Sequence, residues 1–329
     1  MKNLFDYATK ELSQDAFLAW LFANYNCEQE EVKSLSRYLL CSLVEEDYAE
    51  HLNNINNLEI YKQKNDIDLY CVFKIVDKKY VLTIEDKIMA FAHDNQLSKY
   101  KKKIENNFTD SVNKFVYYKT SLIGKEEKQN LENDNPDWRL YDARSIFNLF
   151  ENFLKLNDKA NFTNEILKYY YEHIKGVCDK IKRIKLPYEW GFIEWQSFFE
   201  EYIPIKRLIQ ETEIRCYRKE YVYIKLILEG LEGYKTKVPC FEIRSRDVKN
   251  GLLNVKIVLY NTLTENITKA NIEKWQVKLK EHNLKCTYRN DVTKHKQIGT
   301  FNLEIENNEV SIRNALDNAC QILIKLFWG

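Results

Sequence analysis

The residues with the clearest chemical potential lie at the end of an apolar segment. Residues 80–84 are almost wholly apolar, and they lead directly into Glu85, Asp86 and Lys87. A strand of this composition is usually buried in a sheet, so charges at its end either reach solvent or line a site. Side chains alternate along a strand, which places Glu85 and Lys87 on one face and Asp86 on the other.

A third charged residue, Asp68, lies on the preceding apolar run. The two runs flank the polar triplet 77–79, which suits the turn of a β-hairpin. If the strands pair through this turn, Asp68 lies on the sheet beside Glu85, and two carboxylates converge with the Lys87 ammonium. Asp66 shares the strand face of Asp68, but we expect it at the rim because it precedes the apolar run.

This group of side chains suits a divalent cation. Mg²⁺, with Mn²⁺ as its substitute, prefers a few carboxylate oxygens together with waters and a substrate phosphate. Such a cation would polarise the phosphate and lower the pKa of a bound water. Lys87 would orient that water or neutralise the charge that develops on the phosphorus centre. A Glu-x-Lys triplet alone also occurs by chance in many chains, as an ordinary solvated strand end.

The order of the motifs resembles the PD-(D/E)xK nuclease superfamily, in which an Asp is followed across a hairpin by Glu-x-Lys. Three further segments resemble the same family, over about residues 1–150: a first helix with a Leu-Ala-Trp-Leu run, a Gln-Leu-x-x-Tyr helix and the next core strand, here residues 11–21, 96–100 and 115–118. The chain differs in having Asp86 in place of Asn, and in lacking a Pro before Asp68.

The resemblance implies an enzyme, a Mg²⁺-dependent nuclease that hydrolyses phosphodiester bonds in DNA, with a role in bacterial defence or DNA processing. It implies that Asp68 and Glu85 bind the metal and that Lys87 positions or activates the water. The implied fold is a restriction-endonuclease-like α/β core, a mixed sheet flanked by helices.

Three further side chains take roles only through this resemblance. Glu11 becomes a third carboxylate near the metal, with Asp15 as the alternative, whereas by itself Glu11 is an ordinary acidic residue of a helix's first turn. Gln96 would hold the Lys87 amine, a water or a phosphate. The lysines at 99 and 101–103 become a track for substrate phosphates, although such clusters are usually a solvated helix face.

Periodicity and capping residues predict the elements that position these side chains. Ser13 is a plausible N-cap, and the expected helices are 13–26, 29–49, 93–107, 142–156 and 162–182. The expected strands are 58–63, 67–76, 80–87, 114–122 and 138–141, and residues 124–137 read as a loop. We place a domain boundary near Pro187, giving a nuclease-like domain over 1–186 and a second domain over 187–329.

The second domain has an α+β pattern without a comparable group of charges. A helix over 190–212 precedes strands at 213–218, 221–229, 238–246 and 252–260, and then helix 268–282, strands 284–290 and 298–306, and helix 309–327. Its role is substrate binding, sensing or oligomerisation, so a homo-oligomer or a partner subunit could assemble through it. The alternative to an enzyme is therefore a non-catalytic nucleic-acid-binding or sensor protein on a nuclease fold.

Composition limits the remaining classes of protein. The chain has 329 residues, 45% hydrophobic, with 50 Lys and Arg against 49 Asp and Glu, which excludes a generally basic nucleic-acid coat but not a local basic groove. Eight cysteines without a Cys-x-x-Cys pair indicate reduced thiols. With no signal peptide and no apolar run of membrane-spanning length, we expect a cytoplasmic protein that does not contact a membrane.

Overall fold

The computed structural model divides the chain into two compact units, Met1–Asp179 and Lys180–Gly329. It describes residues 3, 5, 11–51, 53–64, 66–90, 95–202, 209–217, 221–228, 240–244, 248, 251–260, 268–281, 284–286 and 295–328. Within these ranges, the description leaves out the side chains of residues 11–12, 126, 209–244, 260, 271, 285–286, 295–296, 320, 323–324 and 326–328. None of the helices in the described part combines the length and apolar composition that a membrane span requires.

The first unit is built on a mixed five-stranded sheet, as the sequence predicts. Its strands are β1 (Ile55–Lys64), β2 (Ile67–Ile75), β3 (Lys78–Lys87), β4 (Val112–Lys119) and β5 (Trp138–Tyr141), adjacent in that order. The β1–β2 and β2–β3 pairs are antiparallel, whereas β3–β4 and β4–β5 are parallel. The change of direction at β3 brings the carboxyl ends of β3 and β4 to one edge, beside the start of β2.

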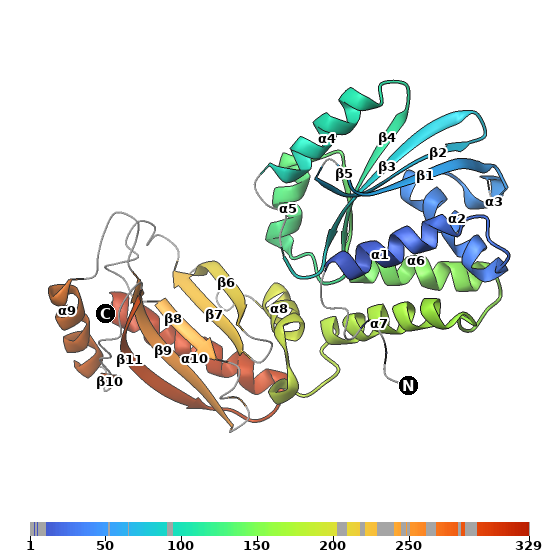
Figure 1. Cartoon of the computed structure of the whole chain (residues 1–329). Helices are drawn as coiled ribbons and strands as arrows, with labels where there is room; N and C mark the ends of the chain where they lie inside the picture. The colour runs from blue at the N-terminus through green and yellow to red at the C-terminus, as the bar shows by residue number, and fades with distance from the viewer. Residues whose placement is uncertain are drawn as a thin grey trace. The chain divides into compact units, whose positions relative to one another are not determined.

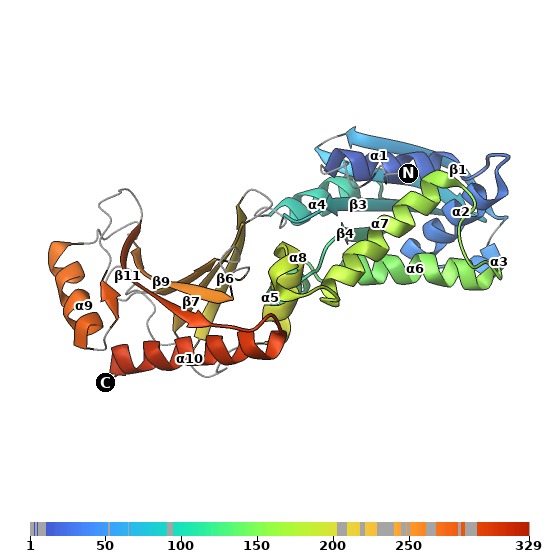
Figure 2. The same ribbon diagram turned by 90° about the horizontal axis from the view of Figure 1, so that it is seen from below.

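Helices cover both faces of this sheet (Figures 1 and 2). In chain order they are α1 (Glu11–Ala23), α2 (Glu30–Val44), α3 (Tyr48–His51), α4 (Gln96–Asn107), α5 (Lys125–Asp134), α6 (Ala143–Leu156) and α7 (Glu165–Ile181). Apolar residues of α4 and α5 pack with Tyr70, Val81 and Tyr117 in one core cluster, so these two helices cover one face. The other face is covered by α1, α2, α6 and α7, which makes the first unit a three-layered α/β fold.

The hairpin between β2 and β3 turns earlier than the sequence predicts. Ile75 pairs with Lys78, so Val76 and Asp77 form a two-residue turn in place of the predicted triplet 77–79. Val76 has a φ of +55°, in the left-handed region that a two-residue hairpin turn requires. The sequence masks this turn because a β-branched residue seldom adopts that conformation, so Val76 reads as part of the strand.

The predicted loop over 124–137 is wrong, because residues Lys125–Asp134 form α5. The segment is rich in Lys, Glu and Gln, which favour helix, but it offers little apolar periodicity. Glu127 and Leu131 are its buried residues among those described, and they lie four positions apart on one helix face. A buried helix face made of one apolar and one charged residue gives no amphipathic pattern, so the sequence does not indicate this helix.

Two helix boundaries of the first unit also differ from the predictions. α1 begins at Glu11, so Ser13 lies inside the helix and is not its N-cap. The predicted helix 29–49 is two helices, because Glu45 adopts a left-handed φ of +66° that ends α2. Asp142 does cap α6, and its side chain accepts hydrogen bonds from the backbone of Arg144 and Ser145.

The second unit has a six-stranded antiparallel sheet, in the order β10-β11-β9-β8-β7-β6. Its strands are β6 (Ile209–Tyr217), β7 (Tyr221–Leu228), β8 (Cys240–Arg244), β9 (Leu252–Tyr260), β10 (Lys285–Cys286) and β11 (His295–Glu304). Its helices are α8 (Phe192–Glu201), α9 (Lys269–Glu281) and α10 (Glu309–Trp328), preceded by a 3-10 turn at Pro187–Glu189. These helices and β9 share one aromatic-rich core, which confirms the predicted α+β pattern.

The predicted helix 190–212 is wrong over its second half. α8 ends at Glu201, and residues from Ile209 onward belong to β6. The sequence carries Pro204, which cannot continue a helix because it lacks a backbone donor. The β-branched residues that follow favour a strand. The aromatic residues of α8 had suggested a longer helix, but they serve the core of this unit.

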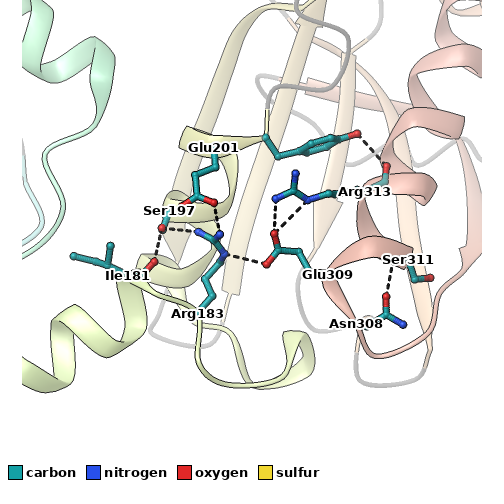
Figure 3. Close-up of polar contacts among 9 residues, drawn as sticks. Ile181, Arg183, Ser197, Glu201, Asn308, Glu309, Ser311 and Arg313 are labelled. Carbon is teal, nitrogen blue, oxygen red and sulfur yellow. Dashed lines mark hydrogen bonds and ion pairs between the residues drawn. The ribbon is translucent and has the colours of Figure 1, made fainter.

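Arg183, whose side chain is 8% exposed, links three segments of the second unit (Figure 3). Arg183 donates to Ser197 Oγ at 2.7 Å and to Glu309 Oε2 at 3.2 Å, and it also pairs with Glu201. Arg313 pairs with the same Glu309 from within α10. This network fixes the segment before α8 against α8 and α10.

A buried carboxylate plays the corresponding role in the first unit, where Glu31 of α2 anchors the start of α7. Glu31 accepts hydrogen bonds from the backbone of Thr163 at 2.9 Å and Asn164 at 2.7 Å, and from Lys159 at 3.1 Å. Burial alone would raise the pKa of Glu31, but the hydrogen bonds from Asn164, Lys159 and Thr163 outweigh it and lower the pKa.

Replacing Glu31 by Gln should lower the free energy of unfolding by about 2 kcal/mol at neutral pH, the usual contribution of hydrogen bonds to a charged group. Because the folded-state pKa lies below the ordinary value of 4.5, this stability is present above pH 4.5 and is lost as the pH falls through the folded pKa. Urea denaturation at several pH values measures it. The neighbouring, exposed Glu30→Gln is the matched control and should change stability by less than about 0.5 kcal/mol. An equal loss at neutral and acid pH would contradict the assignment.

Candidate active site

Asp68, Glu85 and Lys87 come together at one edge of the five-stranded sheet. Leu69 pairs with Ile84, so the next residues along the two strands, Asp68 and Glu85, lie opposite each other. Oδ2 of Asp68 accepts a hydrogen bond from the backbone of Asp86 at 3.3 Å. The face of β3 that carries Glu85 and Lys87 is the face beneath α4 and α5, as the alternation of the strand requires.

Glu85 is the most unusual carboxyl group of the site. It is fully buried, and its Oε1 accepts a hydrogen bond from Lys87 Nζ, which also donates to the backbone oxygen of Asp86 at 3.1 Å. Among the residues that the structure describes, Oε2 of Glu85 has no hydrogen-bond partner. Burial, and next the negative charge of Asp68, raise the pKa of Glu85 to about 8, although Lys87 opposes the shift. The surroundings of Glu85 therefore disfavour its charged form, because the single Lys87 ammonium does not neutralise both carboxylates.

Asp68 is oriented by Gln63, a residue that sequence reasoning missed. The Gln63 side-chain amide donates to Asp68 Oδ1 at 3.4 Å and to Asp15 Oδ2 at 3.1 Å. Gln63 has a φ of +54°, which for a residue with a side chain marks a constrained backbone. The sequence could indicate Gln63 only through the strand register. Lys62 pairs with Leu69 and Lys64 with Ile67, so Gln63 lies opposite Asp68.

The two carboxylates fit a divalent cation. Asp68 and Glu85 supply hard oxygen ligands, and the unpartnered Glu85 Oε2 is the kind of buried atom that a cation satisfies. Among the described side chains, no group of three or more His, Cys, Asp and Glu residues forms a complete metal cluster. The predicted third carboxylate, Glu11, lies in the first turn of α1, and its side chain is outside the described residues. The alternative, Asp15, is buried and shares the Gln63 amide with Asp68.

Gln96 is the first residue of α4, and its side chain hydrogen-bonds Tyr100 on the same helix. Its side-chain amide donates to Tyr100 Oη at 2.8 Å. Burial raises the pKa of Tyr100, and the charges of Glu85 and Asp68 add to the shift, so this hydroxyl lies within the field of the carboxylate pair. The expected contact of Gln96 with the Lys87 amine, a water or a phosphate stays a prediction.

A second buried ion pair lies next to Lys87. Lys119, the last residue of β4, is the register partner of Lys87, and its Nζ donates to both carboxylate oxygens of Glu127 at 2.7 and 2.8 Å. Tyr117 also donates to Glu127, at 3.0 Å. Burial lowers the pKa of Lys119, Glu127 opposes this, and the charge of Lys87 adds to the lowering. The sequence gives no signal for Glu127, because the segment that carries it lacks the apolar periodicity of a buried helix.

On the opposite face of β3, Asp86 belongs to a separate buried network. Gln14 of α1 donates to Asp86 Oδ1, and Thr120 donates to Gln14 Oε1 at 2.6 Å. This network joins α1 to the ends of β3 and β4. Asp86 therefore supports the position of α1 and lies away from the carboxylate pair, as the alternation of strand side chains predicts.

The lysines of α4 divide into paired and exposed residues. Lys101 pairs with Asp137, and Lys103 pairs with Asp66 at 2.8 Å. Asp66 is thus an exposed residue at the rim of the site, as the sequence suggests, and its carboxylate pairs with Lys103. Lys99 and Lys102 are exposed and make no ion pair within the described part of the chain, so two of the four lysines offer a free positive charge to solvent.

Comparison of the chain with known protein families gives a match. A family model described as the PD-(D/E)XK nuclease superfamily matches residues 2–172, just over half of the 329 residues. The match covers the whole five-stranded sheet and every candidate site residue. The sheet and its flanking helices agree with the restriction-endonuclease-like α/β fold that the sequence resemblance implied. Neither a curated protein nor a solved structure matched the chain.

In the metal-free protein, the raised pKa of Glu85 should make stability fall as the pH rises. The folded-state pKa of about 8 lies above the ordinary value of 4.5, so the folded protein keeps a proton that the unfolded chain releases. This stabilising contribution is complete below pH 4.5 and is lost as the pH rises through about 8. Glu85→Gln mimics the protonated form and should therefore become progressively more stable than the wild type between these pH values.

Urea denaturation in EDTA across this pH range measures the difference between the two proteins. Each pKa unit corresponds to about 1.4 kcal/mol, so a difference of a few kcal/mol is expected at the alkaline end. If Glu85→Gln were instead the less stable protein at pH 8, the ionised Glu85–Lys87 pair would stabilise the fold. That result would contradict a raised pKa for Glu85.

Proposed function

The chain belongs to the PD-(D/E)XK nuclease superfamily, and from this premise we propose that it is a Mg²⁺-dependent nuclease that hydrolyses phosphodiester bonds in DNA. The observation that carries the proposal is the convergence of Asp68, Glu85 and Lys87 at one buried sheet edge. A buried carboxyl whose pKa is raised by burial and by a second carboxylate is typical of functional sites.

Each of the three side chains has a distinct task in the proposed reaction. Asp68 and Glu85 hold the cation through their carboxylate oxygens, and Gln63 fixes the orientation of Asp68. A Mg²⁺ or Mn²⁺ ion bound there would polarise the scissile phosphate and acidify the attacking water. Lys87, held beside Glu85, donates a hydrogen bond to that water or to a phosphate oxygen on which charge develops. Glu11 is a further proposed ligand, and Gln96 supports the site through Tyr100.

The exposed lysines of α4 support a nucleic-acid substrate. Lys99 and Lys102 present positive charge on the helix that covers the active face. Contacts of this kind would bind backbone phosphates without reading sequence, and they would weaken as salt rises. DNA, rather than RNA, and a role in bacterial defence or DNA processing come by analogy with the superfamily.

The proposal extends to the setting in which the protein works. The described cysteines Cys27, Cys41, Cys71 and Cys178 are free thiols, which supports a reducing, cytoplasmic location. We assign residues 1–186 to the nuclease and residues 187–329 to substrate binding, sensing or oligomerisation, through which a homo-oligomer or partner subunit would form.

Removal of the proposed ligands should abolish cutting while leaving DNA binding largely intact. Plasmid and single-stranded DNA are incubated with Mg²⁺, Mn²⁺ or EDTA and with wild type, Asp68→Asn, Glu85→Gln or Lys87→Met. Cleavage should require the metal and should fall by at least about 100-fold in each variant, because each group acts on the reacting atoms. Asp66→Asn is the matched control: it removes a carboxylate two residues from Asp68 that lies exposed at the rim, and it should cut as the wild type does.

Gel-shift binding of the same DNA by the same four proteins, read beside cleavage, distinguishes the alternative function. Wild-type protein that binds DNA but never cuts it, with binding unchanged in all three variants, would show that the nuclease assignment is wrong. The chain would then be a non-catalytic nucleic-acid-binding or sensor protein on a nuclease fold. Cutting that survives in EDTA would contradict the metal-dependent mechanism.

A further inference from the structure

A second buried lysine stands beside the proposed catalytic lysine. Lys87 and Lys119 end the neighbouring parallel strands β3 and β4 and are register partners, so their side chains leave the same face of the sheet. The Lys119 side chain is 1% exposed. Two ammonium groups are therefore held in one buried region, at the spacing of adjacent strands.

Each of the two lysines has a carboxylate of its own. Lys87 donates to Glu85 on its own strand, whereas Lys119 donates to both oxygens of Glu127 on α5. Glu127 is also almost buried and accepts a hydrogen bond from Tyr117. Tyr117 is the register partner of Glu85, so the β4 side chains form a row parallel to Glu85 and Lys87.

Stability alone does not explain this arrangement. A buried ion pair loses the hydration of both charges, and well-packed apolar side chains of similar volume usually serve stability as well or better. What Lys119 does provide is a positive charge that balances Glu127, one strand away from Lys87. A buried carboxylate without that balancing charge would attract a neighbouring ammonium.

We propose that Lys119 is a positioning residue, which neutralises Glu127 and thereby keeps the Lys87 ammonium on Glu85. The inference rests on the proposed nuclease function for its kinetic test, but the position of Lys87 can be measured without any activity. Without the Lys119 ammonium, Glu127 would be a buried carboxylate that keeps only the hydrogen bond of Tyr117, beside the strand that carries Lys87. It would compete with Glu85 for the Lys87 ammonium and draw it across the strands, away from the attacking water.

The test compares Lys119→Met, Lys119→Arg and the double variant Lys119→Met with Glu127→Gln. Met has the length of Lys without its charge, and Gln at 127 still accepts the hydrogen bond of Tyr117. Lys114→Met is the matched control, because Lys114 lies on the same strand but pairs with Glu45 at the surface. The position of Lys87 is determined by crystallography, and kcat and KM are measured on the DNA that wild type cuts.

In Lys119→Met we expect Lys87 Nζ to move from Glu85 to Glu127, with kcat reduced about tenfold or more and KM changed by less than about threefold. Lys119→Arg should keep Lys87 on Glu85 and retain most of the activity. The double variant should return Lys87 to Glu85 and restore kcat to within about threefold of wild type, because the competing carboxylate is gone. Lys114→Met should leave both readouts unchanged.

Three outcomes would overturn the inference. Lys87 remaining on Glu85 in Lys119→Met would show that Lys119 does not position it, whether or not the wild type cuts DNA. A double variant that is as inactive as Lys119→Met would indicate that Lys119 acts on the substrate directly. If Lys119→Met does not fold, the double variant carries the test alone, and displacement of Lys87 from Glu85 in it would contradict the proposal.

Discussion

The register of the β2–β3 hairpin is the constraint on which the candidate site depends. The two-residue turn at Val76 and Asp77 places Asp68 directly opposite Glu85, and a slip by one residue would send the side chains of one strand to the other face. Apolar residues on both faces of β3 hold this register, because each face is buried by helices. The chemistry at the end of the hairpin is therefore fixed by packing along its length.

This register brings the half-buried Asp68 next to the fully buried Glu85, and the surroundings offset the cost only in part. Lys87, the backbone N–H of Asp86 and the Gln63 amide each donate to one of the two carboxylates. One oxygen of Glu85 is still without a hydrogen bond among the described residues, and the pKa of the group stays high. A divalent cation would satisfy that oxygen and neutralise the pair, so metal binding at the proposed site would be coupled to folding stability.

The fold of the first unit was predictable where local pattern and tertiary environment agree. β2 and β3 are apolar runs bounded by charges. Asp142 caps α6 through local hydrogen bonds, which the residue type at this position predicts. Predictions failed where tertiary contacts override local signals. The left-handed Glu45 divides one predicted helix in two, and α5 is a charged helix whose buried face consists of one leucine and one glutamate. The strand β6 begins inside a predicted helix because aromatic residues that serve a core were read as helical periodicity.

In the candidate site, too, the residues that depend on tertiary contacts could not be predicted from the sequence. Asp68, Glu85 and Lys87 could be named from the sequence because they share one hairpin, where spacing alone determines which side chains meet. Gln63 and Glu127 could not, because each reaches its partner through the sheet register or the docking of a helix. Glu127 shows the point most clearly: in the sequence it is one acid in a charged segment, and only the packing of α5 on β4 brings it to Lys119. The three residues of the proposed reaction thus leave a pattern in the sequence, whereas the residues that hold them in place are defined by the folded structure.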